Sequence, residues 1–178
     1  MNRLLRLLIA GVVLSVTGCG TTTGLAPETS HSGFDNAQIV NVVPHSNIPN
    51  GSFDMITTGI GAQWNSANKD EVILVIAVFN DYTGISGAEL NIDGEKIVLT
   101  PTPGVTDMTS EGGIKESTKG FVTSLQTVEK IVHSKRTWLR VRTPTGTMEN
   151  AVIDGDKDSK AYNALIRFKE AIAKQQAL

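Results

Sequence analysis

Residues 72–79, which read Val-Ile-Leu-Val-Ile-Ala-Val-Phe, constrain the fold of this 178-residue chain more than any other segment. The run is apolar throughout and rich in β-branched residues, which favour strands over helices. A continuous apolar strand without polar alternation is typical of the centre of a sheet that is covered on both faces. The chain is therefore expected to fold around a sheet.

Asp93-Gly94 is the strongest turn signal, because both residue types accept the positive φ angles of a two-residue hairpin. A hairpin centred there would place Leu90 opposite Ile97, and Ala88 opposite Leu99. Both pairs are apolar, so the turn chemistry and the hydrophobic pattern select the same register.

Apolar alternation and turn signals predict further strands at residues 38–43, 56–64, 119–123, 138–143 and 148–153. The first is expected to end at Pro44, which cannot donate a ladder hydrogen bond. Gly59 and Gly61 share one face of their strand, so another segment is expected to approach the backbone there. Arg142 is expected to face Glu149 across the last hairpin.

Residues 101–116 contain two prolines and three glycines and are expected to form a long irregular loop. Ser124 can cap a short helix, and Asp158 or Ser159 can cap a C-terminal one. The C-terminal helix has one apolar stripe, made of Ala161, Leu165, Phe168 and Ile172. The predicted class is α+β: an antiparallel sheet or sandwich, with one short helix and a C-terminal amphipathic helix packed on it.

Residues 1–18 have the layout of a secretory signal peptide, with Arg3 and Arg6 ahead of a short apolar run. The run has about ten residues, whereas a membrane-spanning helix needs about 20. It ends in Val16-Thr17-Gly18-Cys19, which resembles a bacterial lipobox and contains the only Cys of the chain. The resemblance implies that the Cys19 thiol receives a diacylglycerol, that residues 1–18 are removed, and that the new amino group is acylated.

This resemblance divides the chain into a signal peptide (1–18), a lipidated Cys with a flexible tether (19–35) and a single globular domain (36–178). The tether is rich in Thr, Gly and Ser and spans about 50 Å when fully extended. Gly20 stands where Asp retains lipoproteins of the enteric type at the inner membrane. The resemblance therefore implies an envelope protein on the outer membrane, facing the periplasm, with the membrane as its partner through Cys19.

Three short segments of the globular part are similar to patterns of small uncharacterised envelope lipoproteins. They are Ile92-Asp93-Gly94, Trp138-Leu139-Arg140-Val141 and Asp158-Ser159-Lys160-Ala161. This similarity implies a location and carries no activity.

The composition excludes several classes of function. The net charge of -2 argues against a dedicated nucleic-acid binder, and a single Cys excludes an internal disulfide or a Cys-based zinc site. The three His share no metal-ligand spacing. The acidic run at residues 154–158 starts like a calcium loop but lacks its central Gly and its final Glu, so a polar turn is expected instead. We predict no catalytic residue, metal site or cofactor.

Trp138, Arg140 and Arg142 are the candidate contact residues, since alternate residues of a strand point to the same side. An aromatic ring beside two guanidinium groups can clamp an anion, and in an envelope this means a lipid phosphate, a peptidoglycan carboxylate or an acidic protein. The alternative is that Trp138 packs under the Arg stems and that the charges pair with Glu149 and nearby acids.

Two classes of function follow. The first is a non-catalytic binding, scaffold or assembly module that contacts an envelope protein or an anionic polymer. The second is an enzyme that acts on envelope polymers or peptides through carboxylates brought together by folding.

Lipidation of Cys19 leads to a direct prediction. Cys19→Ser removes the thiol that would carry the lipid, so lipid labelling should disappear and the protein should leave the membrane fraction. Intact-mass analysis of the wild-type chain provides the check. A wild-type protein without acyl chains would contradict the lipobox interpretation.

Overall fold

The chain folds around β4 (Glu71–Phe79), as the apolar run predicts. The structure, a computed structural model, describes residues 25–51 and 54–177. β4 pairs antiparallel with β3 (Thr57–Asn65) on one side and with β9 (Ile114–Ser124) on the other. Its even-numbered residues are buried, but Ile73 and Val75 on the opposite face are only half-buried. The expected cover of both faces is met only in part: Ala77 is also buried on the odd-numbered face, but the shared core forms on the even face.

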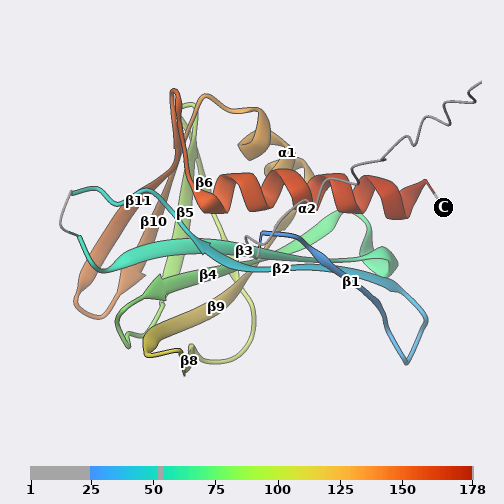
Figure 1. The fold of residues 1–178 in the computed structure, drawn as a ribbon, viewed down its shortest axis with the longest axis horizontal. Helices are drawn as coiled ribbons and strands as arrows, with labels where there is room; N and C mark the ends of the chain where they lie inside the picture. The colour runs from blue at the N-terminus through green and yellow to red at the C-terminus, as the bar shows by residue number, and fades with distance from the viewer. Residues whose placement is uncertain (1–24, 52–53, 178) are drawn as a thin grey trace, which may run out of the picture.

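Two antiparallel sheets form the body of the protein (Figure 1). Sheet A has the order β1-β2-β3-β4-β9-β7, with β8 also paired to β9, and sheet B has the order β12-β11-β10-β5-β6. The other elements are β1 (Glu28–His31), β2 (Gln38–Ser46), η1 (Ser66–Asn68), β5 (Gly87–Ile92), β6 (Glu95–Val98), β7 (Thr100–Pro101), β8 (Asp107–Glu111), α1 (Leu125–His133), β10 (Arg136–Thr143), β11 (Gly146–Asp154), β12 (Lys157–Asp158) and α2 (Lys160–Gln176). Both sheets and both helices contribute to one hydrophobic core, which confirms the α+β class.

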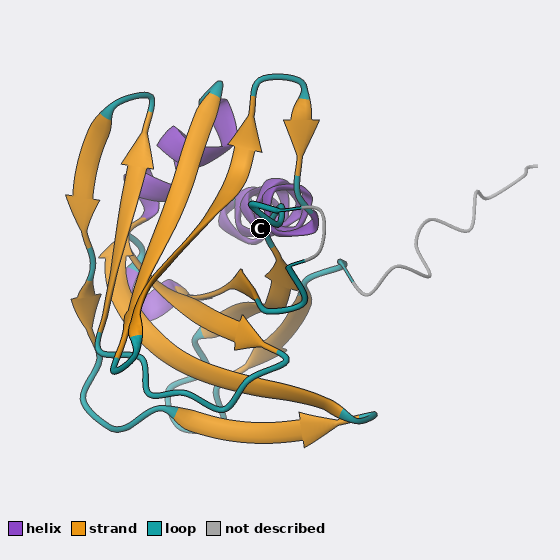
Figure 2. Ribbon diagram, turned by 90° about the vertical axis from the view of Figure 1, so that its left-hand side faces the viewer, coloured by secondary structure: helices purple, strands orange, loops and turns teal. Residues whose placement is uncertain are grey.

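The two helices begin where the sequence predicts. The Ser124 hydroxyl accepts the Thr127 N–H at 3.2 Å, and the Ser159 hydroxyl accepts the Tyr162 N–H at 3.0 Å. Ser159, not Asp158, is therefore the cap of α2. The predicted stripe of α2 is buried throughout. Figure 2 shows this helix end-on, with strands beside and below it. Within the described part of the chain, neither helix is both long and apolar enough to cross a membrane.

β2 continues past Pro44, contrary to the expectation that the strand stops there. A bulge between Val42 and His45 leaves Pro44 out of the ladder, so its missing N–H does no harm. The predicted close approach to Gly61 is confirmed, and the approaching segment is this bulge. A Cβ on Gly61 would lie 2.6 Å from the Val42 carbonyl oxygen and 2.7 Å from the Pro44 nitrogen.

The β5–β6 hairpin has the predicted register. Leu90 lies opposite Ile97, and the Leu99 N–H donates to the Ala88 carbonyl at 3.0 Å. The turn residues Asp93 and Gly94 have φ angles of 49° and 97°, as a two-residue hairpin requires.

Residues 101–116 do not form the expected irregular loop. β8 and β9 make a hairpin there, in which Asp107 pairs with Thr118. Gly112 and Gly113 supply the turn, with φ angles of 58° and 83°. The side chains of this hairpin are mostly exposed, so the apolar alternation that marks a half-buried strand is missing from the sequence.

β1 corrects the boundary of the expected tether, residues 19–35. All four β1 residues pair with β2, although all four side chains are exposed. Backbone hydrogen bonds alone add this strand to the sheet edge, so no hydrophobic pattern announces it. Leu25, which is 8% exposed, already belongs to the core. The folded body therefore includes residues 25–35, while Cys19 and the signal peptide lie outside the described residues.

The turn between β1 and β2 is closed by polar contacts. The Ala37 N–H donates to the Asp35 carboxylate at 3.1 Å. Hydrogen bonds from the Ser32 hydroxyl and from the Ala37 N–H hold the pKa of the Asp35 carboxyl below its ordinary value. The turn is accordingly stabilised above the ordinary pKa of Asp, and this contribution is lost as the pH falls through the lowered value.

A buried polar cluster joins the two sheets. The backbone N–H and the hydroxyl of Thr58, in sheet A, donate to the Asn150 side-chain oxygen of sheet B at 2.9 and 3.0 Å. The Asn47 side-chain amide donates to the Thr58 hydroxyl at 2.9 Å. All three residues are buried. The Asn150 oxygen and the Thr58 hydroxyl are satisfied within the cluster, which lets these groups lie inside an otherwise apolar core, whereas the Asn47 side-chain oxygen has no partner among the described residues.

Gly61→Ala should lower the free energy of unfolding by about 1–3 kcal/mol, because its Cβ would collide with the backbone of β2 rather than with a movable side chain. Gly87→Ala is the matched control, since the nearest atom to its Cβ is 3.5 Å away. The control should change stability by less than about 0.5 kcal/mol. Urea unfolding of both variants is the measurement, and equal midpoints would contradict the close approach.

Candidate functional site

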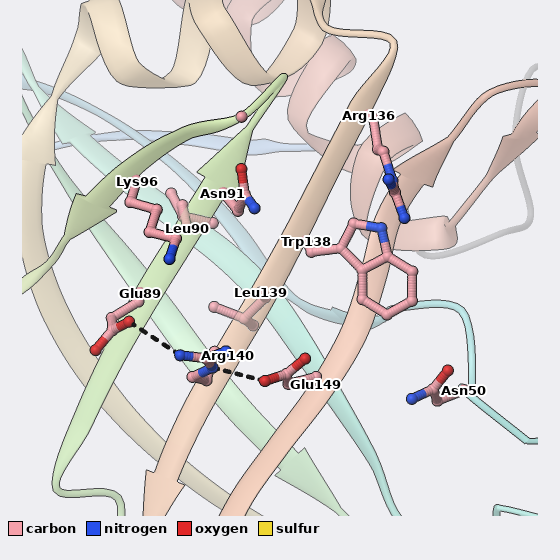
Figure 3. A pocket seen from close by; sticks show the side chains of 11 residues that line it. Asn50, Glu89, Leu90, Asn91, Lys96, Arg136, Trp138, Leu139, Arg140 and Glu149 are labelled. Carbon is pink, nitrogen blue, oxygen red and sulfur yellow. Dashed lines mark hydrogen bonds and ion pairs between the residues drawn. The ribbon is translucent and has the colours of Figure 1, made fainter.

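The outer face of sheet B collects the predicted contact residues (Figure 3). β10 lies between β5 and β11, and successive side chains of each strand alternate between the two faces. Leu90 and Leu139 are buried in the core. Their neighbours Glu89, Trp138 and Arg140 therefore project from the opposite, outer face.

Arg140 lies between two carboxylates. The register places Glu89 on one side of it and Glu149 on the other. Arg140 Nε donates to Glu149 Oε1 at 2.6 Å, and Arg140 Nη1 lies 3.6 Å from Glu89 Oε2. Arg142 Nη2 also donates to Glu89 Oε1. The Glu89 side chain, only 15% exposed, is thus held by two guanidinium groups.

The expected pairing of Arg142 with Glu149 is wrong. Arg142 lies opposite Thr147, and Arg140 faces Glu149 instead. The connection between β10 and β11 is the two-residue turn at Pro144, which places Thr143 opposite Gly146 and so fixes the register.

Trp138 supplies the apolar part of the site. Arg136 lies over the indole, with its Cζ 5.7 Å from the ring centroid, and its Nε forms an ion pair with Asp154 Oδ1 at 3.1 Å. The Asp93 carboxylate accepts the backbone N–H of Arg136 at 2.8 Å, which anchors the start of β10. The buried Trp138 Nε1 has no hydrogen-bond partner among the described residues. Packing and Arg136, rather than the polar atom of the indole, hold the ring.

These side chains border a cavity of about 430 Å³. Figure 3 shows Arg140 between the two glutamates, with Trp138 and Asn50 on one side and Lys96 on the other. The lining residues are Asn50, Glu89, Leu90, Asn91, Gly94, Lys96, Arg136, Trp138, Leu139, Arg140 and Glu149. Asn50 reaches the cavity from the β2–β3 connection, which the Ile48 N–H attaches to the Ala151 carbonyl at 2.8 Å.

The positively charged side chains of the cavity differ in the number of carboxylates that they contact. Arg140 contacts two carboxylates and Arg136 contacts one. Lys96 forms no ion pair with any residue that the structure describes, and its side chain is exposed. An anion that enters the cavity would therefore meet the Lys96 ammonium and the outer face of Arg136 before it could compete for Arg140.

The structure brings two of the three predicted contact residues to the cavity. Trp138 and Arg140 line it, whereas Arg142 is not among the lining residues and instead holds Glu89. The charges of Arg140 and Arg142 are paired with Glu89 and Glu149, in agreement with the alternative expectation for these contact residues. Sequence reasoning missed Glu89, Lys96 and Asn50. The Asp93-Gly94 hairpin could have placed Lys96 opposite Asn91, but nothing in the sequence pairs β5 with β10.

The other groups considered for chemistry lie apart from this cavity. His45 and His133 line two other hollows, and His133 Nε2 lies 2.9 Å from Lys169 Nζ. In residues 25–51 and 54–177, no three His, Cys, Asp or Glu side chains lie close enough to share a metal ion. In the acidic turn considered for calcium, Asp154 pairs with Arg136, and Asp158 accepts the Asn163 amide at 3.0 Å.

No model of a known protein family matches the chain, and neither a curated protein nor a solved structure matches it.

Because Arg140 and Arg142 both contact Glu89, substitutions of the two arginines are expected to have non-additive effects on the free energy of unfolding. Arg142→Ala alone should cost less than about 1 kcal/mol of unfolding free energy, because Glu89 keeps Arg140 and the pair is partly exposed. The double variant Arg140→Ala/Arg142→Ala leaves Glu89 without a guanidinium, so it should cost at least about 0.5 kcal/mol more than the sum of the single changes. Urea unfolding of the four proteins measures this coupling, and strict additivity would show that Glu89 does not join the two arginines.

Proposed function

We propose that this protein is a lipid-anchored lipoprotein of the bacterial envelope, located at the outer membrane and facing the periplasm, which binds peptidoglycan through the cavity on sheet B without catalysing a reaction. The anchor rests on Val16-Thr17-Gly18-Cys19 at the end of a short apolar run. Three acyl chains on Cys19 would give stable attachment, since a single chain binds a membrane only marginally.

One observation carries the binding role: an aromatic ring, two side-chain amides, carboxylates and an unpaired ammonium border the same cavity. A volume of about 430 Å³ lies within the usual range for small-ligand sites. Polar groups of both signs around an apolar surface suit a ligand that has hydroxyl, amide and carboxylate groups together.

Peptidoglycan has these groups, because its sugars carry peptide stems that end in carboxylates. In the proposed complex, the apolar face of a sugar ring lies on Trp138, and its hydroxyl and amide groups bond to Asn50 and Asn91. The stem carboxylate is held by Lys96 and Arg136 through charge-assisted hydrogen bonds. Arg140 has a positioning role, since it holds both glutamates at the edge of the cavity.

Glu89 and Glu149 support a second candidate function, an enzyme acting on envelope polymers. Two carboxylates that border one cavity are the minimum for acid–base cleavage of a glycosidic bond. Such a reaction needs one group to donate a proton to the leaving oxygen. Both carboxylates accept contacts from Arg140 instead, which favours the binding role.

Co-sedimentation of the mature protein with purified peptidoglycan tests the proposal. Lys96→Ala/Arg136→Ala should weaken binding by about tenfold or more, because a charge-assisted hydrogen bond contributes about 1.5–3 kcal/mol. Sacculi whose carboxylates have been converted to amides should bind the wild type about as weakly as intact sacculi bind the variant.

Lys115→Ala/Lys119→Ala is the matched control, because it removes the same charge from residues outside the cavity. It should bind like the wild type. Equal binding by the control and cavity variants would overturn the proposal. Release of soluble fragments from the sacculi by the wild type, and not by Glu149→Gln, would establish the enzyme instead.

A further inference from the structure

Three cations form a stripe along α2. Lys160, Arg167 and Lys174 recur every seventh residue, and a straight helix drifts by only about 20° over that interval. They lie outside the buried stripe that packs on the sheets. Lys160 and Lys174 are exposed and Arg167 is half-buried.

The stripe lies on the flank of α2 that faces β2 rather than α1. The α1 flank is occupied, since Lys169 contacts His133 and the Tyr162 hydroxyl donates to the Val132 carbonyl at 2.9 Å. Lys160 borders a hollow whose other lining residues include Pro44 and Ser46 of β2.

None of the three cations forms an ion pair with a residue of the described chain. Glu170, the only acid of α2, borders the groove towards α1. Arg167 Nη1 is buried and finds no acceptor among the described residues. This flank is thus positive in a chain whose acids outnumber its Lys and Arg by 18 to 16.

The start of the folded body lies beside the same flank. Leu25 shares the core with the buried residues of α2, and Figure 1 shows the first described residues, in blue, beneath this helix. In the β1–β2 pair Glu28 lies opposite Asn41, so the chain that precedes β1 runs towards the Pro44 end of β2. That end borders the stripe at Lys160.

The distance available to an anchor at Cys19 is short. Six residues, Gly20 to Leu25, span at most about 22 Å. A folded body of this size has a radius of gyration of about 15 Å, so its diameter exceeds that reach. A lipid on Cys19 would therefore keep the side of the body near Leu25 close to the lipid headgroups.

We propose that the stripe of Lys160, Arg167 and Lys174 lies on the anionic phospholipid surface in which the Cys19 anchor is inserted. This inference rests on the anchor of the proposed function. Each Lys or Arg near such a surface favours contact by about fivefold, and salt weakens the attraction. Docking would orient the body and leave the cavity of sheet B accessible, because that cavity opens on the face of the sheet opposite α2 (Figure 3).

Acetylation of lysine amines, followed residue by residue with peptide mass spectrometry, tests the orientation. The mature protein is reconstituted in vesicles of phosphatidylethanolamine and phosphatidylglycerol at 7:3, and in vesicles of phosphatidylcholine alone. Lys160 and Lys174 should react several-fold more slowly in the anionic vesicles, and 0.5 M NaCl should remove the difference. Lys69 and Lys115 are internal controls and should react equally in both.

Arg167→Gln should reduce the protection of Lys160 and Lys174 by about fivefold, whereas the matched change Lys115→Gln should not alter it. Flotation of the vesicles reports the anchor separately, so a protein that fails to float refutes the anchor itself. A protein that floats while Lys160 and Lys174 react as fast as Lys115 would overturn the docking. Equal protection in both kinds of vesicle would overturn the role of the anionic lipid.

Discussion

The buried hydrogen bonds between Thr58 and Asn150 determine how the two sheets meet. Apolar packing alone tolerates small shifts of one sheet against the other, whereas a buried polar group without a partner costs about 1–3 kcal/mol. Thr58 offers both its N–H and its hydroxyl to one oxygen of Asn150, and Asn47 completes the hydroxyl's contacts. A shift of either sheet would break these bonds together.

The functional face follows from this junction. Asn150 points into the core, so Glu149, its neighbour on β11, projects outward and reaches Arg140. Asn47 begins the connection that bonds to β11 at Ala151 and then carries Asn50 to the cavity. β11 therefore contributes Asn150 to the junction of the sheets on its inner face and Glu149 to the cavity on its outer face.

Local signals in the sequence predict local structure well. The caps Ser124 and Ser159, the Asp93-Gly94 hairpin and the stripe of α2 all depend on residues within a few positions of one another. β1 and β8 were not predicted, because backbone pairing rather than side-chain burial holds them in the sheet and no apolar alternation marks them. Pro44 led to a wrong strand end, because a bulge leaves Pro44 out of the ladder and its missing N–H is not required there.

The candidate site was predictable only in part, for a related reason. Trp138 and Arg140 lie on one strand and share a face by alternation. Their partner Glu89 comes from a strand about 50 residues earlier, and Asn50 from a connection earlier still. Glu89 and Glu149 lie directly opposite Arg140, and Glu89 also contacts Arg142. The outer face of sheet B therefore carries charges of both signs rather than the positive patch that the sequence of β10 suggests.

β1 also determines how the protein would respond to mechanical force. In the proposed lipoprotein, a load between the outer membrane and a bound cell wall enters the body through the residues just ahead of β1. The four β1–β2 residue pairs, in which the β1 side chains are exposed, receive that load first, together with Leu25. Separation of β1 from β2 would lengthen the segment between Cys19 and the folded body by about ten residues, or about 35 Å. The core formed by β3, β4 and α2 would stay in place. The edge strand would then serve as an extensible link, so that the spacing between membrane and wall could change without unfolding the domain that joins them.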